Sequence, residues 1–528
     1  MADPADPAKS VQSAEAGEPE SESGVSGGGA SGAGAPVGRP GAGADAEVEP
    51  GSETAAETAA KVMAESAASA ARAEGELLRP PAKRSNIWAL VWPSALANAL
   101  YSAVALATLK AIGYMGADAV AANNNAARIF FIFQAIVFGM STGAVAMVSQ
   151  AIGNQKAEEA GRVVGLTLAL GVVLSGVIGL VFFLIPGALA GLFNTDANTH
   201  ELTREFIYWS AFFAFAHIGM IIFSSVLRAA GDARTPLWLG GAANVITIAL
   251  LAVLVNGYGD IIPAYGMAGA VAAQGIGFAL ISLLLGALWL RGRLVIPGVI
   301  RQIWTGRRLR ALLRVSAPAV VEGLAFNVGL FVYVWIIAGF GTVANAAYGI
   351  GVQVLLVSIM VGVGFQIAAS TVVGQSIGAR RPHTAYRDGW RCMRLAIYCM
   401  SAFTFVLVVF AEEIALFMID DKAVAADAVV FVRMLGISQP LMAIEFTLSG
   451  ALRGAGDTRS PFVITSVGLT SRLLCAGLAV WLDLHVYWLY AAVIFDYGIK
   501  STLFIIQYRS GRWARDSRLR AWRAGYMG

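Results

Sequence analysis

Twelve stretches of this chain are long and apolar enough to cross a lipid bilayer, and this restricts the fold more than any other feature. A helix needs about 20 apolar residues to span the hydrocarbon core, and lipid admits only helices and closed barrels. Of the 528 residues, 57% are hydrophobic and 14% are charged, whereas about one quarter of a soluble domain is charged. We therefore predict an all-α integral membrane protein. The predicted spans are 87–112, 124–149, 162–185, 205–228, 236–256, 267–290, 315–338, 348–373, 391–411, 429–452, 461–482 and 485–507.

The segments around the spans divide the chain further. Residues 1–85 are rich in Ala, Gly, Ser, Glu and Pro and contain no aromatic residue, so we expect a disordered acidic tail. The tail lacks a basic region followed by a short apolar core, so no signal peptide is predicted. We expect a six-helix N-terminal lobe at 86–290, a basic linker at 291–314 that skims anionic lipid headgroups, a six-helix C-terminal lobe at 315–507 and a basic tail at 508–528.

Lysine and arginine gather on one side of the predicted spans. With the N-terminal tail in the cytoplasm, the cytoplasmic side receives the linker, the C-terminal tail and most arginines of the short loops. The other side holds little beyond Arg204 and Lys422 in loops, with Lys110, Arg128 and Arg433 near span ends. Because basic loops stay in the cytoplasm, we predict a multi-pass protein of the cell membrane with both termini cytoplasmic.

One ten-residue phrase occurs twice. It reads LRAAGDARTP at 227–236 and LRGAGDTRSP at 452–461, so the numbering offset between the copies is 452 − 227 = 225. The same offset carries Pro93 onto Pro318 and Gln150 onto Gln375, which indicates an internal duplication. Since each half contains an even number of spans, the halves are predicted to be parallel repeats. Transporters built in this way bind their substrate between the repeats.

The repeated phrase predicts a structural corner at the cytoplasmic side of each half. Arg228 and Arg453 end the fourth spans, and Asp232 and Asp457 are expected to pair with neighbouring arginines or to cap the following turn. Thr235 and Ser460 are expected to cap the next helix, with the following proline at its first position.

These features together resemble the multidrug and toxic compound extrusion (MATE) family. The resemblance covers 87–507 and depends on the paired phrases, on QAIGNQ at 150–155 and QSIGAR at 375–380, and on WPSALAN at 92–98. It implies two six-helix lobes arranged in a V around a central cleft. It also implies export of organic cations by antiport, with H⁺ or Na⁺ as the coupling ion and no other cofactor.

Two carboxylates within the second-half spans are the main candidates for binding the coupling ion. Charged groups at bilayer depth are costly and therefore functional candidates. Glu322 and Glu445 have no basic residue three or four positions away, and a desolvated glutamate can take up a proton near neutral pH. The resemblance implies acidic coupling residues in the seventh and tenth spans. The alternative role for each is a hydrogen bond that helps the helices to pack.

Other charges in the spans have simpler interpretations. Asp496 and Lys500 are four positions apart on one helix face, which predicts a structural ion pair. Arg472 is expected to pair with a carboxylate of the second half or to extend towards the headgroups.

The chain departs from the MATE pattern in its first span. Many members carry an aspartate there, whereas the stretch ALATLKAIGYMG places Thr108 at that position and Lys110 two residues later. No carboxylate lies deep in a first-half span, so we expect coupling in the C-terminal lobe. Polar residues of the spans are candidates for the substrate cleft, although such residues also join helices to one another. The cleft candidates are Asn98, Thr108, Lys110, Asn327, Tyr333 and Gln353.

The sequence leaves three kinds of function open. The first is a secondary-active multidrug exporter of small amphipathic cations. The second is a flippase or exporter of a lipid-linked or anionic natural product, which Lys110 and Arg472 leave open. The third is a membrane-embedded enzyme, for which the sequence offers no HExxH motif or other catalytic group of residues. An ATP-driven pump is disfavoured because GxxxxGK[ST] is missing from the sequence.

The expected partners follow from the same residues. The three cysteines have neither metal-site spacing nor a disulfide framework. We expect small-molecule substrates and the lipid bilayer as partners, with no metal, no nucleic acid and no obligate protein partner.

Overall fold

The computed structural model describes residues 86–193, 195–257, 261–419 and 421–515. The predicted disordered tail at 1–85 and the end of the basic tail at 516–528 lie outside the described residues. All the described helices belong to one compact unit of the chain. Twelve of them are long and apolar enough to cross a membrane, which confirms the predicted all-α membrane fold.

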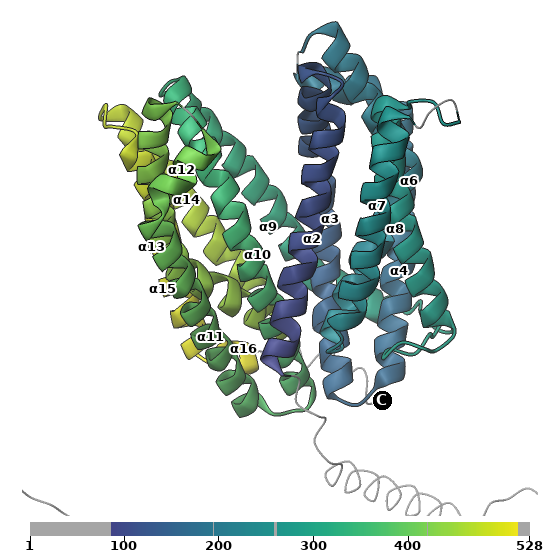
Figure 1. Ribbon diagram of the computed structural model, residues 1–528. Coiled ribbons are helices and arrows are strands. Elements are labelled where there is room, and N and C mark those ends of the chain that lie inside the picture. The colour runs from purple at the N-terminus through teal and green to yellow at the C-terminus, as the bar shows by residue number, and fades with distance from the viewer. Residues whose placement is uncertain (1–85, 194, 258–260, 420, 516–528) are drawn as a thin grey trace, which may run out of the picture. The chain divides into compact units, whose positions relative to one another are not determined.

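Each lobe contains six of these long helices (Figure 1). The N-terminal lobe comprises α2 (Ile87–Gly113), α3 (Ala117–Gly153), α4 (Ala157–Leu184), α6 (Ala197–Ala229), α7 (Arg234–Asn256) and α8 (Gly266–Leu290), with the short α5 (Pro186–Ala190) and a 3-10 turn (Gly191–Phe193). The C-terminal lobe comprises α9 (Gly306–Ala338), α10 (Thr342–Gly378), α11 (Pro382–Val409), α13 (Lys422–Gly454), α14 (Arg459–Trp481) and α15 (Tyr487–Arg509), with the short α12 (Ala411–Met418) and α16 (Arg512–Arg515).

The duplication seen in the sequence is repeated in the backbone. The bounds of α3, α4, α6 and α7 become those of α10, α11, α13 and α14 when the same offset is added, as 342 − 117 = 225 shows for α3 and α10. The turns match as well. Gly116 and Gly341 have φ of 106° and 104°, and Gly231 and Gly456 have φ of 97° and 90°. These angles favour glycine because other residues would be strained there.

In each copy of the repeated phrase the aspartate caps the following turn, which is one of the two roles predicted for it. Asp232 accepts a hydrogen bond from the backbone N–H of Thr235 at 3.0 Å, and Asp457 accepts one from Ser460 at 3.0 Å. Helices α7 and α14 begin at Arg234 and Arg459, so each proline is the third helical residue rather than the first. The prediction that Thr235 and Ser460 are the caps was wrong because an aspartate three residues earlier reaches the free N–H group.

The linker differs from its prediction. Helix α9 begins at Gly306 instead of 315, and Thr305 caps it by accepting from the N–H of Arg308 at 3.4 Å. Between α8 and α9, Ile296 is 1% exposed. A Cβ atom on Gly161 of α4 would overlap the carbonyl oxygen of Pro297. The linker therefore packs against α4 instead of only lying along headgroups.

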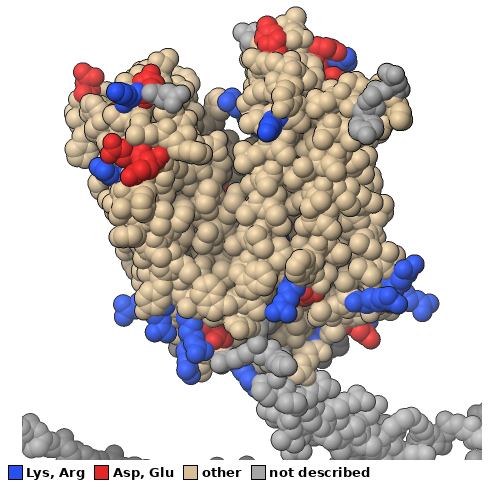
Figure 2. Space-filling model, viewed as in Figure 1, with Lys and Arg blue, Asp and Glu red and all other residues tan. Residues whose placement is uncertain are grey.

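The first helix of each lobe packs against the second helix of the other lobe. Helix α2 contacts α7 of its own lobe and α10 of the other, while α9 contacts α14 of its own lobe and α3 of the other. The two lobes separate towards the upper end in Figure 1. The space-filling view in Figure 2 shows a notch between them there, and Lys and Arg gather along the lower end. We call this lower end, where α3, α6, α10 and α13 end, the basic end.

Candidate ion and substrate sites

Two glutamines join the lobes reciprocally at the basic end. The side-chain amide of Gln150, on α3, donates to the carbonyl oxygen of Gly454 at the end of α13, at 3.0 Å. The amide of Gln375, on α10, donates to the carbonyl oxygen of Ala229 at the end of α6, at 3.1 Å. Both donors and both acceptors are related by the offset of the repeat, since 375 − 150 and 454 − 229 both equal 225. We call these two bonds the glutamine pair.

Glycines allow the close approach that these bonds require. A Cβ atom on Gly153 would overlap the carbonyl oxygen of Gln375, and one on Gly378 would overlap that of Gln150. The sequence drew attention to QAIGNQ and QSIGAR as a repeated motif. It did not predict that the two copies contact each other, because the offset alone does not say which surfaces meet.

A buried charge tetrad lies inside the C-terminal lobe. It consists of Glu445 on α13, Arg472 on α14, and Asp496 and Lys500 on α15, and the four side chains are between 1% and 15% exposed. The Lys500 ammonium lies 3.0 Å from Asp496 and 3.4 Å from Glu445. Arg472 forms an ion pair with Asp496.

The tetrad confirms two predictions and adds a contact that the sequence did not reveal. The Asp496–Lys500 pair and the pairing of Arg472 with a second-half carboxylate were both predicted. The contact of Glu445 with Lys500 was missed because the residues are on different helices, 55 positions apart (500 − 445 = 55). Local spacing along one helix cannot show such a partner.

Aromatic rings surround the tetrad. The Arg472 guanidinium lies 5.4 Å from the ring centre of Tyr333 and 5.9 Å from that of Tyr497, distances at which a cation and a ring attract each other. Tyr333 is 0% exposed, and its hydroxyl donates to the carbonyl oxygen of Leu489 at 2.5 Å. Tyr333 therefore lies in the core of the lobe and does not line an open surface in this conformation.

Glu322 has partners from two other helices. Its carboxylate accepts from Arg453 of α13 at 2.7 Å and from the hydroxyl of Thr465 of α14 at 2.9 Å. Arg453 follows Glu445 by eight residues on α13, which corresponds to about 12 Å along the helix. The two candidate coupling carboxylates therefore lie at different depths, with Glu322 nearer the basic end.

The N-terminal lobe has no carboxylate at the position equivalent to Glu322. Subtraction of 225 carries Glu322 to Ala97 and Arg453 to Arg228. The Arg228 Nε atom is buried without a hydrogen-bond partner in the described part of the chain. At the position where the MATE resemblance implies an aspartate, Thr108 donates to Val104 at 2.9 Å and accepts from Gln274 at 3.3 Å. These contacts are polar but carry no charge.

The remaining cleft candidates are scattered. Lys110 and Gln353 are exposed and Asn98 is partly buried, while Asn327 donates to the carbonyl oxygen of Gly323 on its own helix at 2.8 Å. Within the described residues, no hydrogen bond joins any two of the six cleft candidates. The structure thus leaves their predicted role in substrate binding as a prediction.

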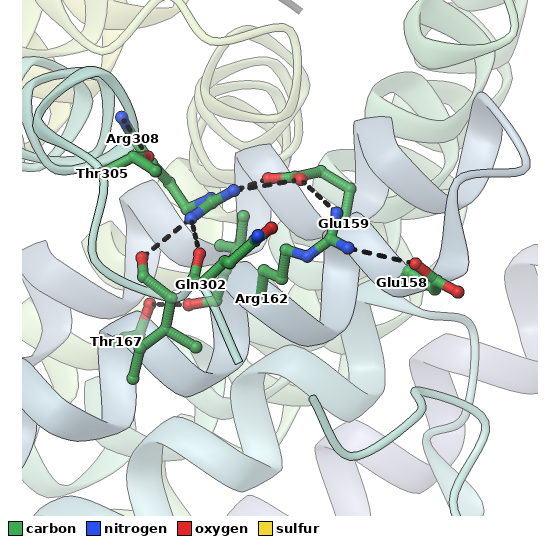
Figure 3. A network of polar contacts seen from close by, with 9 residues as sticks. Glu158, Glu159, Arg162, Thr167, Gln302, Thr305 and Arg308 are labelled. Carbon is green, nitrogen blue, oxygen red and sulfur yellow. Dashed lines mark hydrogen bonds and ion pairs between the residues drawn. The ribbon is translucent and has the colours of Figure 1, made fainter. Parts of the chain in front are cut away.

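A buried ion pair fastens α9 to the other lobe. Arg308 donates to Glu159 of α4 at 2.8 and 3.2 Å, and also to the carbonyl oxygens of Gln302 and Ile303 at 2.8 Å (Figure 3). Both side chains are nearly buried, at 6% and 7% exposed. No sequence rule indicated this contact because its residues are 149 positions apart.

Comparison with known proteins identifies the family. The family model described as MatE matches residues 93–253 and 318–476, and the starts of the two matched segments differ by the offset of the repeat (318 − 93 = 225). The chain belongs to the MatE family. It is accordingly a transporter and not an enzyme, and the twelve-helix, two-lobe MATE architecture inferred from the sequence is confirmed.

Relatives of known name and structure match most of the chain. The chain is 26% identical over 461 residues to the probable multidrug resistance protein NorM of Thermotoga maritima, and the match covers 85% of this chain and 97% of the relative. It is 27% identical over 412 residues to the multidrug resistance protein NorM of Burkholderia vietnamiensis, covering 75% and 86%. Among solved structures, a MOP superfamily transporter from Pyrococcus furiosus shares the fold, with a TM-score of 0.75, 18% identity and coverage of 82% and 96%.

Proposed function

We propose that this protein is a secondary-active multidrug exporter of small amphipathic organic cations, driven by antiport with H⁺ or Na⁺. The names of the NorM relatives support multidrug efflux. We place the protein in the cell membrane with the basic end and both termini in the cytoplasm, because basic segments stay on that side.

The observation that carries the proposal is the reciprocal contact of the two lobes at the basic end. The glutamine pair closes that end with bonds of 3.0 and 3.1 Å, while Figure 2 shows the notch at the opposite end. In the proposed orientation this conformation is open to the outside. If the glutamine pair broke and the notch closed, a substrate site between the lobes would instead open to the cytoplasm. An antiporter needs this alternation of access between the two sides.

Glu322 and Glu445 are the proposed coupling residues. Glu322 holds Arg453, which belongs to the corner at the end of α13. An ion that binds Glu322 would compete with Arg453 and release this corner, whose neighbour Gly454 accepts the bond from Gln150. The proposal therefore links ion binding in the C-terminal lobe to the contact between the lobes.

Dye efflux tests the function and the two residues together. Right-side-out vesicles loaded with ethidium would receive a proton gradient or a Na⁺ gradient, with wild type, Glu322→Gln and Glu445→Gln compared. Glu158→Gln is the matched control because that side chain is 76% exposed. We expect gradient-driven efflux in wild type and the control and its loss in at least one of the other two variants. Efflux kept in both would refute the site assignment while antiport stands.

A lipid-linked or anionic substrate is the second candidate. It is favoured by the exposed Lys110 and by Arg228, which forms no ion pair with a described residue. Absence of ethidium efflux under either gradient would favour this candidate, and Lys110→Gln would then be the first variant to compare with wild type.

A further inference from the structure

The position of Lys500 between two buried carboxylates bears on which ion drives transport. Its ammonium lies 3.0 Å from Asp496 and 3.4 Å from Glu445, and its side chain is 2% exposed. A monovalent cation that bound both carboxylates would need the same place. Lys500 thus occupies the position of such a cation while remaining attached to α15.

The neighbouring helices fix Lys500 at this place. Gly468 of α14 has no side chain, and a Cβ atom there would overlap both the Asp496 carboxylate and the Lys500 side chain. Arg472 of α14 also pairs with Asp496, so Asp496 is held by two cations. The absence of a side chain at position 468 therefore lets the charges of α15 lie directly against α14.

Among the described residues, Lys500 forms an ion pair with no carboxylate other than Asp496 and Glu445. Tyr497 of α15 has its ring centre 5.4 Å from the ammonium. Tyr333 of α9 faces Arg472 and stacks edge-on against Tyr348 of α10. With two carboxylates, one guanidinium and one ammonium, the tetrad is neutral when all four groups are charged. A further cation would thus be added to a neutral site that already holds an ammonium, and repulsion at this short range is strong.

We infer that Lys500 determines ion selectivity: its ammonium takes the place of Na⁺ between Glu445 and Asp496, so the C-terminal lobe couples to H⁺ and not to Na⁺. This inference rests on the proposed function, because it selects between the two coupling ions. A proton, unlike Na⁺, needs no coordination shell and can bind the Glu445 carboxylate while Lys500 stays with Asp496. The Oε2 atom of Glu445 has no hydrogen-bond partner among the described residues, so one oxygen is left to receive that proton.

Removal of the lysine should create a Na⁺ site. We would measure the thermal stability of purified wild type, Lys500→Ala and Lys500→Arg in NaCl and in choline chloride. Efflux would be measured separately under a Na⁺ gradient at constant pH and under a proton gradient without Na⁺. We expect wild type and Lys500→Arg to show no specific stabilisation by Na⁺, and wild-type efflux to follow the proton gradient alone. Lys500→Ala leaves one negative charge in excess and should be stabilised by Na⁺, and Glu445→Gln added to it should abolish that shift.

The outcomes separate this inference from the proposed function. Wild-type protein that is stabilised by Na⁺, or whose efflux follows a Na⁺ gradient, would overturn the inference while antiport stands. The inference would also be overturned if Lys500→Ala folds and its thermal stability is the same in NaCl as in choline chloride. If Lys500→Ala does not fold, the two wild-type measurements still decide. A lack of wild-type efflux under both gradients would contradict the proposed function. The comparison of thermal stability in NaCl and choline chloride would then test by itself whether Lys500 excludes Na⁺.

Discussion

Loss of the glutamine pair should shift the balance between the two conformations of the transporter. In Gln150→Ala and Gln375→Ala, one interlobe hydrogen bond of 3.0 or 3.1 Å is removed from the basic end. A typical intramolecular hydrogen bond contributes about 0.5–1.5 kcal/mol net. The double variant should therefore lose about 1–3 kcal/mol of preference for this conformation, which is about a 5–150-fold change in the population ratio.

Distances between spin labels at the far end of the molecule would measure this shift. Leu192 and Phe417 are related by the repeat (417 − 192 = 225), and they are 73% and 93% exposed. With the three native cysteines replaced, labels at these positions should show a larger fraction of short distances in the double variant than in wild type. Each single variant should have an intermediate effect of similar size.

Gln353→Ala is the matched control, since this exposed glutamine makes no hydrogen bond with another described residue. An unchanged distance distribution in the double variant would refute the reasoning. So would a shift of equal size in the control.

Three further predictions concern contacts that hold the lobes and corners in place. Glu159→Ala removes the carboxylate that pairs with the buried Arg308 guanidinium and should lower the stability of the protein by about 3–5 kcal/mol. Glu158→Ala removes an exposed pair and should lower it by only about 0.2–1 kcal/mol. Thermal inactivation of the purified variants would compare them, and equal losses of stability would contradict a special role for the buried pair. Gly378→Val places a side chain against the carbonyl oxygen of Gln150, so it should lower the population of this conformation in the label experiment, and a wild-type distribution would argue against tight packing there. Asp457→Ala removes the cap of α14 and should cost about 0.5–2 kcal/mol, measured by the same inactivation assay, with no change in stability counting against the cap.

The helices, the duplication and the corners could be predicted because they depend on local properties of the chain. A run of apolar residues has few alternatives in lipid, since its backbone groups must bond to one another. The offset of the repeat follows directly from the two copies of the ten-residue phrase, which begin at Leu227 and at Leu452. Asp496 and Lys500 were recognised as a pair because they lie on successive turns of one helix and share a face.

The partners from distant helices were decided only by the tertiary structure. Glu322 and Glu445 looked like isolated charges, yet Arg453 and Lys500 reach them from other helices. The linker has the composition of a surface segment, yet it packs against α4, where Gly161 leaves room for Pro297. The Glu159–Arg308 pair fastens the start of α9 to the same helix. The sequence by itself determined which helices form and that they form twice. Which side chains meet depends on how the helices pack, and that is set by the fit of many surfaces at once, which spacing along the chain does not specify.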